Sequence, residues 1–281
     1  DPALVDTVYI SETNKVYDWP NTVTAYPTGM DSEGIVAFAK RRNQLGLLKR
    51  DGVWQIGGSS GSTGISVSNI SVSQVSVGSG GCVAPDSVVT IDDTVYWLGA
   101  DGVYKWDDSG VVSVSDSTVA PWFRTDTYFQ RTRFPNAFAK YNEARDQYEL
   151  HIANVGDTSE NRWVAYNVKT GGWYGPHLTS AFTPTHAAFI DDEDGLPMTL
   201  VGGSDGVLYK GNQTTFRDAA ATAIAIDTYG PWHSADAPDI EHFWGQLSMH
   251  SQVESAGTLT VTPTVGRLDS SAGSAISHAL T

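Results

Sequence analysis

The sequence is short of cysteine: Cys82 is the single one among 281 residues. No disulfide can therefore form within one chain, which excludes a small cystine-stabilised scaffold. We expect Cys82 to be a small buried side chain at the start of a strand, since free cysteine usually packs as a small hydrophobe. The chain also lacks any apolar run near the ~18 residues of a membrane helix, so no segment is expected to span a bilayer.

Positive charge is also scarce. The chain has 17 Lys and Arg against 32 Asp and Glu, a formal net charge of −15. This balance argues against a protein that wraps nucleic acid through phosphate contacts, and it favours a surface that repels DNA. The first residue is Asp1 and no signal-like segment follows it, so we expect the chain to begin inside a longer polypeptide.

Helix signals are nearly absent, with one helical turn expected at 218–223, and β signals are abundant. The stretch 87–107 predicts strands at 87–91, 94–98 and 103–106, rich in β-branched and aromatic residues. Between the last two, Asp101-Gly102 is typical of a type I′ hairpin turn with positive φ angles. The stretch therefore reads as an antiparallel meander.

The same sequence pattern recurs along the chain: an apolar strand is followed by a turn, then by a β-branched residue and an aromatic residue. Asp51-Gly52, Asp101-Gly102 and Asp205-Gly206 are the clear corners, and Gly171-Gly172 and the segment 13–17 are looser versions. Such repeats predict an all-β fold, a β-propeller-like array of small antiparallel sheets built from Asp-Gly hairpins, in preference to a β-sandwich. We expect about five units over residues 1–217, and a β module over 218–281 that closes the propeller or forms a small sandwich.

Other segments give weaker predictions. Ser alternates with Val or Ile over 57–80, which predicts one or two strands with phase slips at Asn69 and Gln74. The irregular region 116–133 has Pro121-Trp122-Phe123 as its expected anchor. The first hairpin is expected to pair 8–11 with 15–19, and Lys40-Arg41-Arg42 is expected to be a solvated turn.

No motif predicts catalysis. Residues 57–61 match G-x-S-x-G, but a β pattern surrounds them where a nucleophile elbow needs a helix. His242 and His250 share strand parity without a zinc motif, and the acidic run 191–194 lacks the spacing of a calcium loop. We therefore expect no catalytic residue, no cofactor and no metal, and a protein that is not an enzyme.

The segments 81–89 and 95–104 resemble tailed-bacteriophage tail hub proteins, the tail nozzle, tail tubular or packaged-DNA stabilisation type. Segments 8–12 and 45–54 fit the same pattern in the same order, and the resemblance covers roughly residues 7–265. It implies a virion structural protein that forms a homo-oligomeric, hexameric ring below the portal and adaptor. Such a ring retains packaged DNA and conducts it out through its lumen without sequence-specific binding.

Ring interfaces favour aromatic anchors, and the candidates are Trp122, Phe123, Trp232 and Trp244, each of which could instead belong to the core. Two other functions stay open. A carbohydrate-binding or glycoside-processing propeller would stack Trp and Tyr on sugar and use two carboxylates. A receptor-binding or adhesin module would bind its ligand without turnover.

Overall fold

The computed structural model describes residues 34–211 except 43, 59–69, 78–79, 180–181 and 196, together with 7–8, 26–27, 217–218, 222–223, 257–261 and 276–280. The chain divides into two compact units, Asp1–Ile224 and Ala225–Thr281. The second unit is described at β20 (Gly257–Val261) and β21 (Ile276–Leu280), which pair antiparallel. The predicted boundary at 217 and the architecture of the C-terminal module stay predictions.

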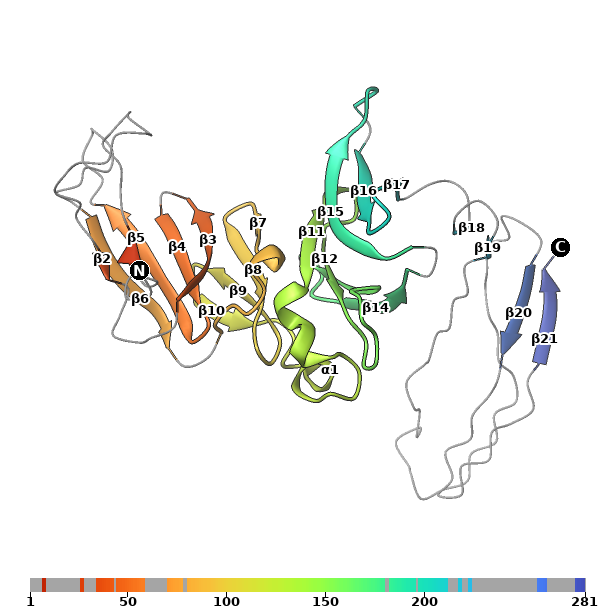
Figure 1. The fold of residues 1–281 in the computed structure, drawn as a ribbon, viewed down its shortest axis with the longest axis horizontal. Helices are drawn as coiled ribbons and strands as arrows, with labels where there is room; N and C mark the ends of the chain where they lie inside the picture. The colour runs from red at the N-terminus through yellow and green to blue at the C-terminus, as the bar shows by residue number, and fades with distance from the viewer. Residues whose placement is uncertain are drawn as a thin grey trace, which may run out of the picture. The chain divides into compact units, whose positions relative to one another are not determined.

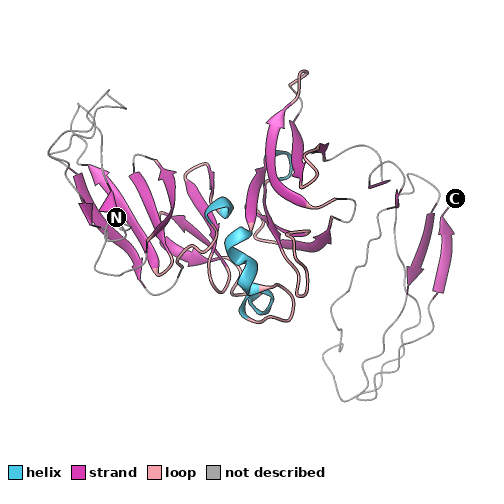
Figure 2. Ribbon diagram, in the orientation of Figure 1, coloured by secondary structure: helices cyan, strands magenta, loops and turns pink. Residues whose placement is uncertain are grey.

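The first unit is built from small antiparallel sheets that follow one another along the chain (Figures 1 and 2). The first sheet contains β3 (Ile35–Arg41), β4 (Gln44–Lys49), β5 (Gly52–Gly58) and β6 (Ile70–Val77); the second contains β7 (Val89–Ile91), β8 (Thr94–Leu98), β9 (Val103–Asp107) and β10 (Gly110–Ser113). The third contains β11 (Phe138–Asn142), β12 (Gln147–Ile152), β13 (Arg162–Asn167) and β14 (Trp173–Leu178); the fourth contains β15 (Pro184–Asp191), β16 (Pro197–Gly203) and β17 (Leu208–Lys210).

Each of these sheets is a meander in which consecutive strands pair. The first strand of each sheet contacts the first strand of the next, so that β3 meets β7, β7 meets β11 and β11 meets β15. Propeller blades are sheets of this kind, with consecutive blades in contact. The predicted all-β fold, a propeller-like array of small antiparallel sheets, is confirmed.

The second sheet is buried on both faces. Val95 and Trp97 pack toward the first sheet, whereas Tyr96 and Leu98 belong to the core shared with the third sheet. Because successive strand residues point to opposite faces, a strand between two cores must be apolar at every position. This explains the uninterrupted run in β8, and the predicted strands at 94–98 and 103–106 are confirmed.

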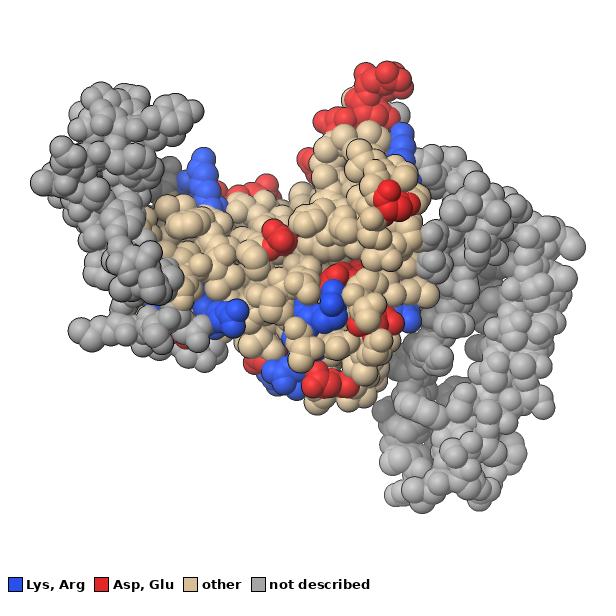
Figure 3. Space-filling view, viewed as in Figure 1, with Lys and Arg blue, Asp and Glu red and all other residues tan. Residues whose placement is uncertain are grey.

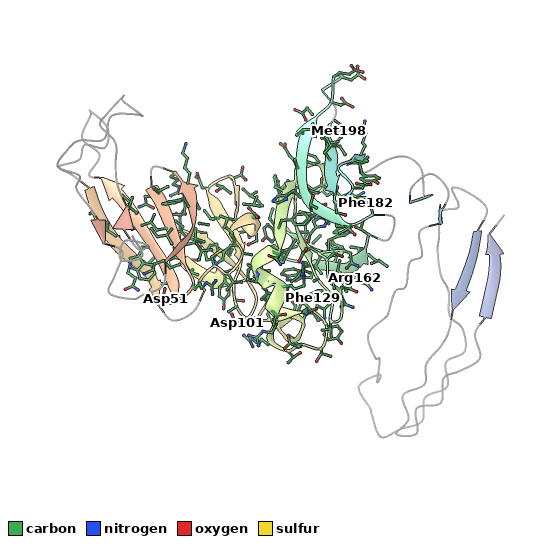
Figure 4. All side chains as sticks on the ribbon, in the orientation of Figure 1. Asp51, Asp101, Phe129, Arg162, Phe182 and Met198 are labelled. Carbon is green, nitrogen blue, oxygen red and sulfur yellow. The ribbon has the colours of Figure 1, made fainter. Side chains whose placement is uncertain are left out.

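The four predicted corners all join consecutive strands, but not equivalent ones. Asp51-Gly52, Asp101-Gly102 and Asp205-Gly206 join the second strand of a sheet to its third. Gly171-Gly172 instead joins the third strand β13 to the fourth strand β14, so it is not a repeat of the other corners. In Figure 4, Asp51 and Asp101 mark the corresponding corners of the first and second sheets.

The predicted type I′ geometry is wrong at Asp101-Gly102, because neither residue has a positive φ. Asp51 and Gly52 have no positive φ either. The Gly99 nitrogen donates to the Gly102 carbonyl at 2.8 Å, which pairs these two residues just beyond the ends of β8 and β9 and leaves Ala100-Asp101 as the turn. Positive φ angles occur at Gly171 (72°) and Gly206 (80°), as single positions and not as pairs.

Residues in the left-handed conformation lie instead between the first and second strands of each of the four sheets described above. Arg42, Asp92, Asp146 and Gly195 occupy these turns, with φ of 51°, 50°, 53° and 73°. Asp tolerates this conformation because its short side chain bonds to nearby backbone, and glycine adopts it without strain. The repeat is therefore better marked by this turn than by Asp-Gly.

Two predictions about helix were wrong. The region 116–133 contains α1 (Ala120–Arg124), with Pro121 in its first turn, where a missing N–H costs nothing. The expected helical turn at 218–223 is instead a pair of short strands, β18 (Arg217–Asp218) and β19 (Thr222–Ala223).

The N-terminal strands are described in part. The segment 9–25, with most of the predicted first hairpin, lies outside the described residues, and β1 (Thr7–Val8) pairs with β2 (Tyr26–Pro27). In the region 57–80, β6 confirms a strand and its register against β5 shifts at Val75, beside the predicted slip at Gln74. Asn69 lies outside the described residues.

Candidate functional site: the junction of the first three sheets

The segment 80–87 connects β6 to β7 and joins the first two sheets through backbone hydrogen bonds. The Cys82 nitrogen donates to the Lys49 carbonyl at the end of β4, at 2.8 Å. The Val83 nitrogen donates to the Leu98 carbonyl at the end of β8, at 3.0 Å. The segment therefore pairs with both sheets at once, at the ends of their second strands.

Gly81 lies so close to the first sheet that no side chain fits. A Cβ at this position would be 1.9 Å from the Arg50 carbonyl oxygen and 2.2 Å from the Arg50 carbonyl carbon. Both are backbone atoms, which cannot rotate away as a flexible side chain can. Glycine here is required by the close approach of two chain segments.

Trp97 and Cys82 fill the space beside this crossing. Trp97 is fully buried, donates from Nε1 to the Gly80 carbonyl at 3.0 Å and stacks on Tyr104. Cys82 is also fully buried, as predicted, but it lies in the connecting segment and not at the start of a strand. Burial raises the pKa of its thiol to about 12. A thiol with this pKa is protonated at neutral pH, so Cys82 is inert packing and not a nucleophile.

Ser87 extends the junction to the third sheet. Its hydroxyl donates to the Ala84 carbonyl at 2.7 Å and accepts from the Leu98 nitrogen at 2.9 Å. Its own carbonyl accepts from the hydroxyl of Tyr148, on β12, at 2.8 Å. Ser87 and Tyr148 are both fully buried, so one serine fixes the relative placement of the second and third sheets.

A charged cluster links the first and second sheets at the turn after β3. Arg41 pairs with Asp108 and lies 5.2 Å from the centre of the Trp106 ring, and Arg42 reaches Asp108 at 2.8 Å and Asp93 at 3.0 Å. Arg41 is buried, so the predicted solvated turn is wrong for this residue. Hydrogen bonds from Arg41 and then Arg42 lower the pKa of the Asp108 carboxyl.

The predicted interface aromatics separate into different environments. Phe123 is fully buried among Phe129, Phe134 and Trp173, so of the two alternatives left open it belongs to the core and not to an interface. Trp122 is half-buried against the same core. The remaining candidates, Trp232 and Trp244, lie outside the described residues.

A buried polar group on the third sheet was not predicted from the sequence. Lys140, Asn142 and Glu149 are 5%, 1% and 5% exposed and contact one another through side-chain hydrogen bonds. His151 lies on the same face of β12, fully enclosed, and burial followed by repulsion from Lys140 lowers its pKa to about 3. The signal in the sequence was polar residues alternating within strongly β-forming segments, which by itself usually indicates a solvated face.

Little in the described residues points to catalysis. Gly57 and Gly58 of the G-x-S-x-G match belong to β5, and Ser59 lies outside the described residues, as do His242 and His250. The acidic run 191–194 forms the tip of the β15–β16 hairpin, where Figure 3 shows acidic side chains gathered, and Asp192 lies 3.8 Å from Lys210. Within the part of the chain that the structure describes, no three His, Cys, Asp or Glu side chains group as metal ligands, and no helix is long and apolar enough to cross a membrane.

No protein-family model matches the chain, and no curated protein matches its sequence. Among solved structures, two of the extracellular domain of BT4673 from B. thetaiotaomicron are similar, each at 13% identity and with TM-scores of 0.39 and 0.38. They match 74% and 75% of this chain, which spans 25% of theirs. At these TM-scores we draw no conclusion from them about function.

Proposed function

We propose that the chain is a non-enzymatic structural component of a tailed-bacteriophage tail hub. The observation that carries the proposal concerns the segments 81–89 and 95–104, on which the resemblance rests. Gly81 and Ser87 of these segments join sheets, since Gly81 permits the crossing and Ser87 bonds to two sheets. Asp101 accepts a hydrogen bond from Tyr104 at 2.7 Å within the β8–β9 corner. These residues hold the sheets of one chain together, which supports a structural role for the two segments.

The charge of the chain agrees with a DNA channel. A wall that gripped phosphates would retard a sliding duplex, whereas a net charge of −15 weakens such contacts. In this proposal copies of the chain form a ring in the virion, assembled in the host cytoplasm, that contacts the portal and adaptor. DNA passes its lumen without sequence-specific binding.

The proposal is tested first by the genes that flank this one and then by imaging. Portal and adaptor genes beside it, and rings in negative-stain images of the purified chain with adaptor protein, are the expected results. Flanking genes for polysaccharide breakdown, together with a chain that stays monomeric beside adaptor protein, would overturn the proposal.

One observation favours a carbohydrate-binding module as the second candidate. The rings of Trp163 and His177 lie 4.1 Å apart on β13 and β14, where His177 is exposed, and aromatic faces of this kind suit a sugar ring. A glycan array separates the candidates. Retention without cleavage would favour a binding or adhesin module, cleavage would indicate a glycoside-processing enzyme, and neither is expected of a hub.

A further inference from the structure

The polar group on the third sheet lies at the side that meets the fourth sheet. Lys140 and Asn142 are two positions apart on β11, so their side chains leave the same face of the strand. Glu149 is directly opposite Lys140 on β12. Thr199, on β16 of the fourth sheet, accepts a hydrogen bond from Lys140 Nζ at 3.3 Å, which shows that the fourth sheet covers the group.

Glu149 holds the other two side chains, one on each carboxylate oxygen. Its Oε2 accepts from Lys140 Nζ, and its Oε1 accepts from Asn142 Nδ2 at 2.7 Å. The Asn142 carbonyl oxygen is buried and has no hydrogen-bond partner among the described residues. An amine and a carboxamide are thus held on the two oxygens of one carboxylate, in a site where all three residues are buried.

This site favours a nucleophilic amine. A buried ion pair pays a large desolvation penalty, and burial lowers the pKa of Lys140, so the neutral amine is more accessible here than at the surface. Residues two apart on a strand are about 6.6 Å apart at Cα, a distance that the four methylenes of lysine can span. Desolvated lysine beside a base is an established nucleophile arrangement.

We propose that Lys140 and Asn142 form an intramolecular isopeptide bond, with Glu149 acting as the proton carrier. Glu149 takes a proton from the Lys140 ammonium, and the neutral Nζ attacks Cγ of Asn142. Glu149, now protonated, gives this proton to the Asn142 amide nitrogen, which leaves as ammonia when the Cγ–Nδ2 bond breaks, and the regenerated carboxylate takes a second proton from Nζ. The second proton stays on Glu149, so the products are an Nζ–Cγ amide, ammonia and a neutral carboxyl group.

The reaction removes both members of a buried ion pair from a low-dielectric interface, which is its physical driving force. Because it depends only on the third and fourth sheets, it holds or fails independently of the tail hub proposal. The amide closes a small ring over one strand, and it fixes the Lys140 side chain beneath the fourth sheet.

Mass spectrometry of the purified full chain tests the bond. The intact mass is expected to be lower by one ammonia than the sequence requires. Trypsin should fail to cleave after Lys140, so that the peptide 134–145 appears uncut and lacks one ammonia, while cleavage after the exposed Lys169 proceeds normally. An unmodified mass with cleavage at Lys140 overturns the proposal.

Two further outcomes also overturn it. Loss of ammonia with cleavage retained at Lys140 would identify a succinimide at Asn142, and loss of one water with cleavage blocked would identify a Lys140–Glu149 amide.

Glu149→Gln keeps the side-chain shape without the base, and it should restore the full mass and cleavage at Lys140. The matched control Glu143→Gln, at an exposed carboxyl group on the same hairpin, should stay modified. The mass and cleavage of peptide 134–145 from the wild-type chain show whether the bond exists. The proposal can therefore be tested even if a variant folds poorly.

Discussion

Replacing Gly81 by alanine tests the junction most directly. The added Cβ would lie 1.9 Å from the Arg50 carbonyl oxygen and 2.2 Å from its carbon, whereas carbon atoms in contact lie about 3.5–4.0 Å apart. The segment must therefore move by more than about 1 Å, which breaks the 2.8 Å hydrogen bond from the Cys82 nitrogen to the Lys49 carbonyl. Each buried group left unpaired costs about 1–3 kcal/mol, so we expect a loss of about 2–5 kcal/mol in the free energy of unfolding.

Urea denaturation followed by tryptophan fluorescence measures this loss, because Trp97 is hydrogen-bonded to the neighbouring Gly80. With a slope of about 1–3 kcal/mol per molar, the midpoint should fall by about 0.7 M or more. The matched control is Gly57→Ala, at a strand position where a Cβ meets nothing within 4 Å. Equal midpoints for Gly81→Ala and Gly57→Ala would refute the argument that close approach fixes this glycine.

Three further predictions concern buried side chains. Phe123→Ala should lower the free energy of unfolding by about 3–5 kcal/mol, and Trp122→Ala by about half as much because this side chain is half-buried; equal losses in urea denaturation would contradict the assignment of Phe123 to the core. Cys82, with its pKa raised to about 12, should resist iodoacetamide at pH 8 in the folded protein and react once urea unfolds it; labelling of the folded protein would contradict its burial. The folded pKa of His151, about 3, lies below the unfolded value near 6.5, so stability should fall as pH drops from about 6.5 toward 3, by up to about 1.4 kcal/mol per unit. Urea midpoints of His151→Phe should depend less on pH over this range, and an unchanged dependence would contradict the prediction.

The sequence determined the features that depend on near neighbours. β8 and β9 were predicted almost to the residue, because β-branched and aromatic residues flank a short turn. The predicted slip at Gln74 rested on a break in the alternation of Ser with Val or Ile, and the register shift between β5 and β6 lies beside it. The position of the Asp101-Gly102 corner was correct, but its turn type was not, because the length of the strand ladder decides which residues form the turn.

Only the tertiary structure decided which side chains meet across sheets. Arg41 appeared to be a solvated cation until folding placed it against Asp108, 67 residues away. Gly81 gave no local signal of its role, since the atoms that exclude a side chain belong to Arg50 on another sheet. Nothing in the local sequence indicates that Lys140 and Glu149 are buried, because the fourth sheet, which contacts Lys140 through Thr199, covers them. Local sequence determines where these strands and turns lie, because it depends on neighbouring residues, whereas the packing of separate sheets determines which faces of the strands are buried.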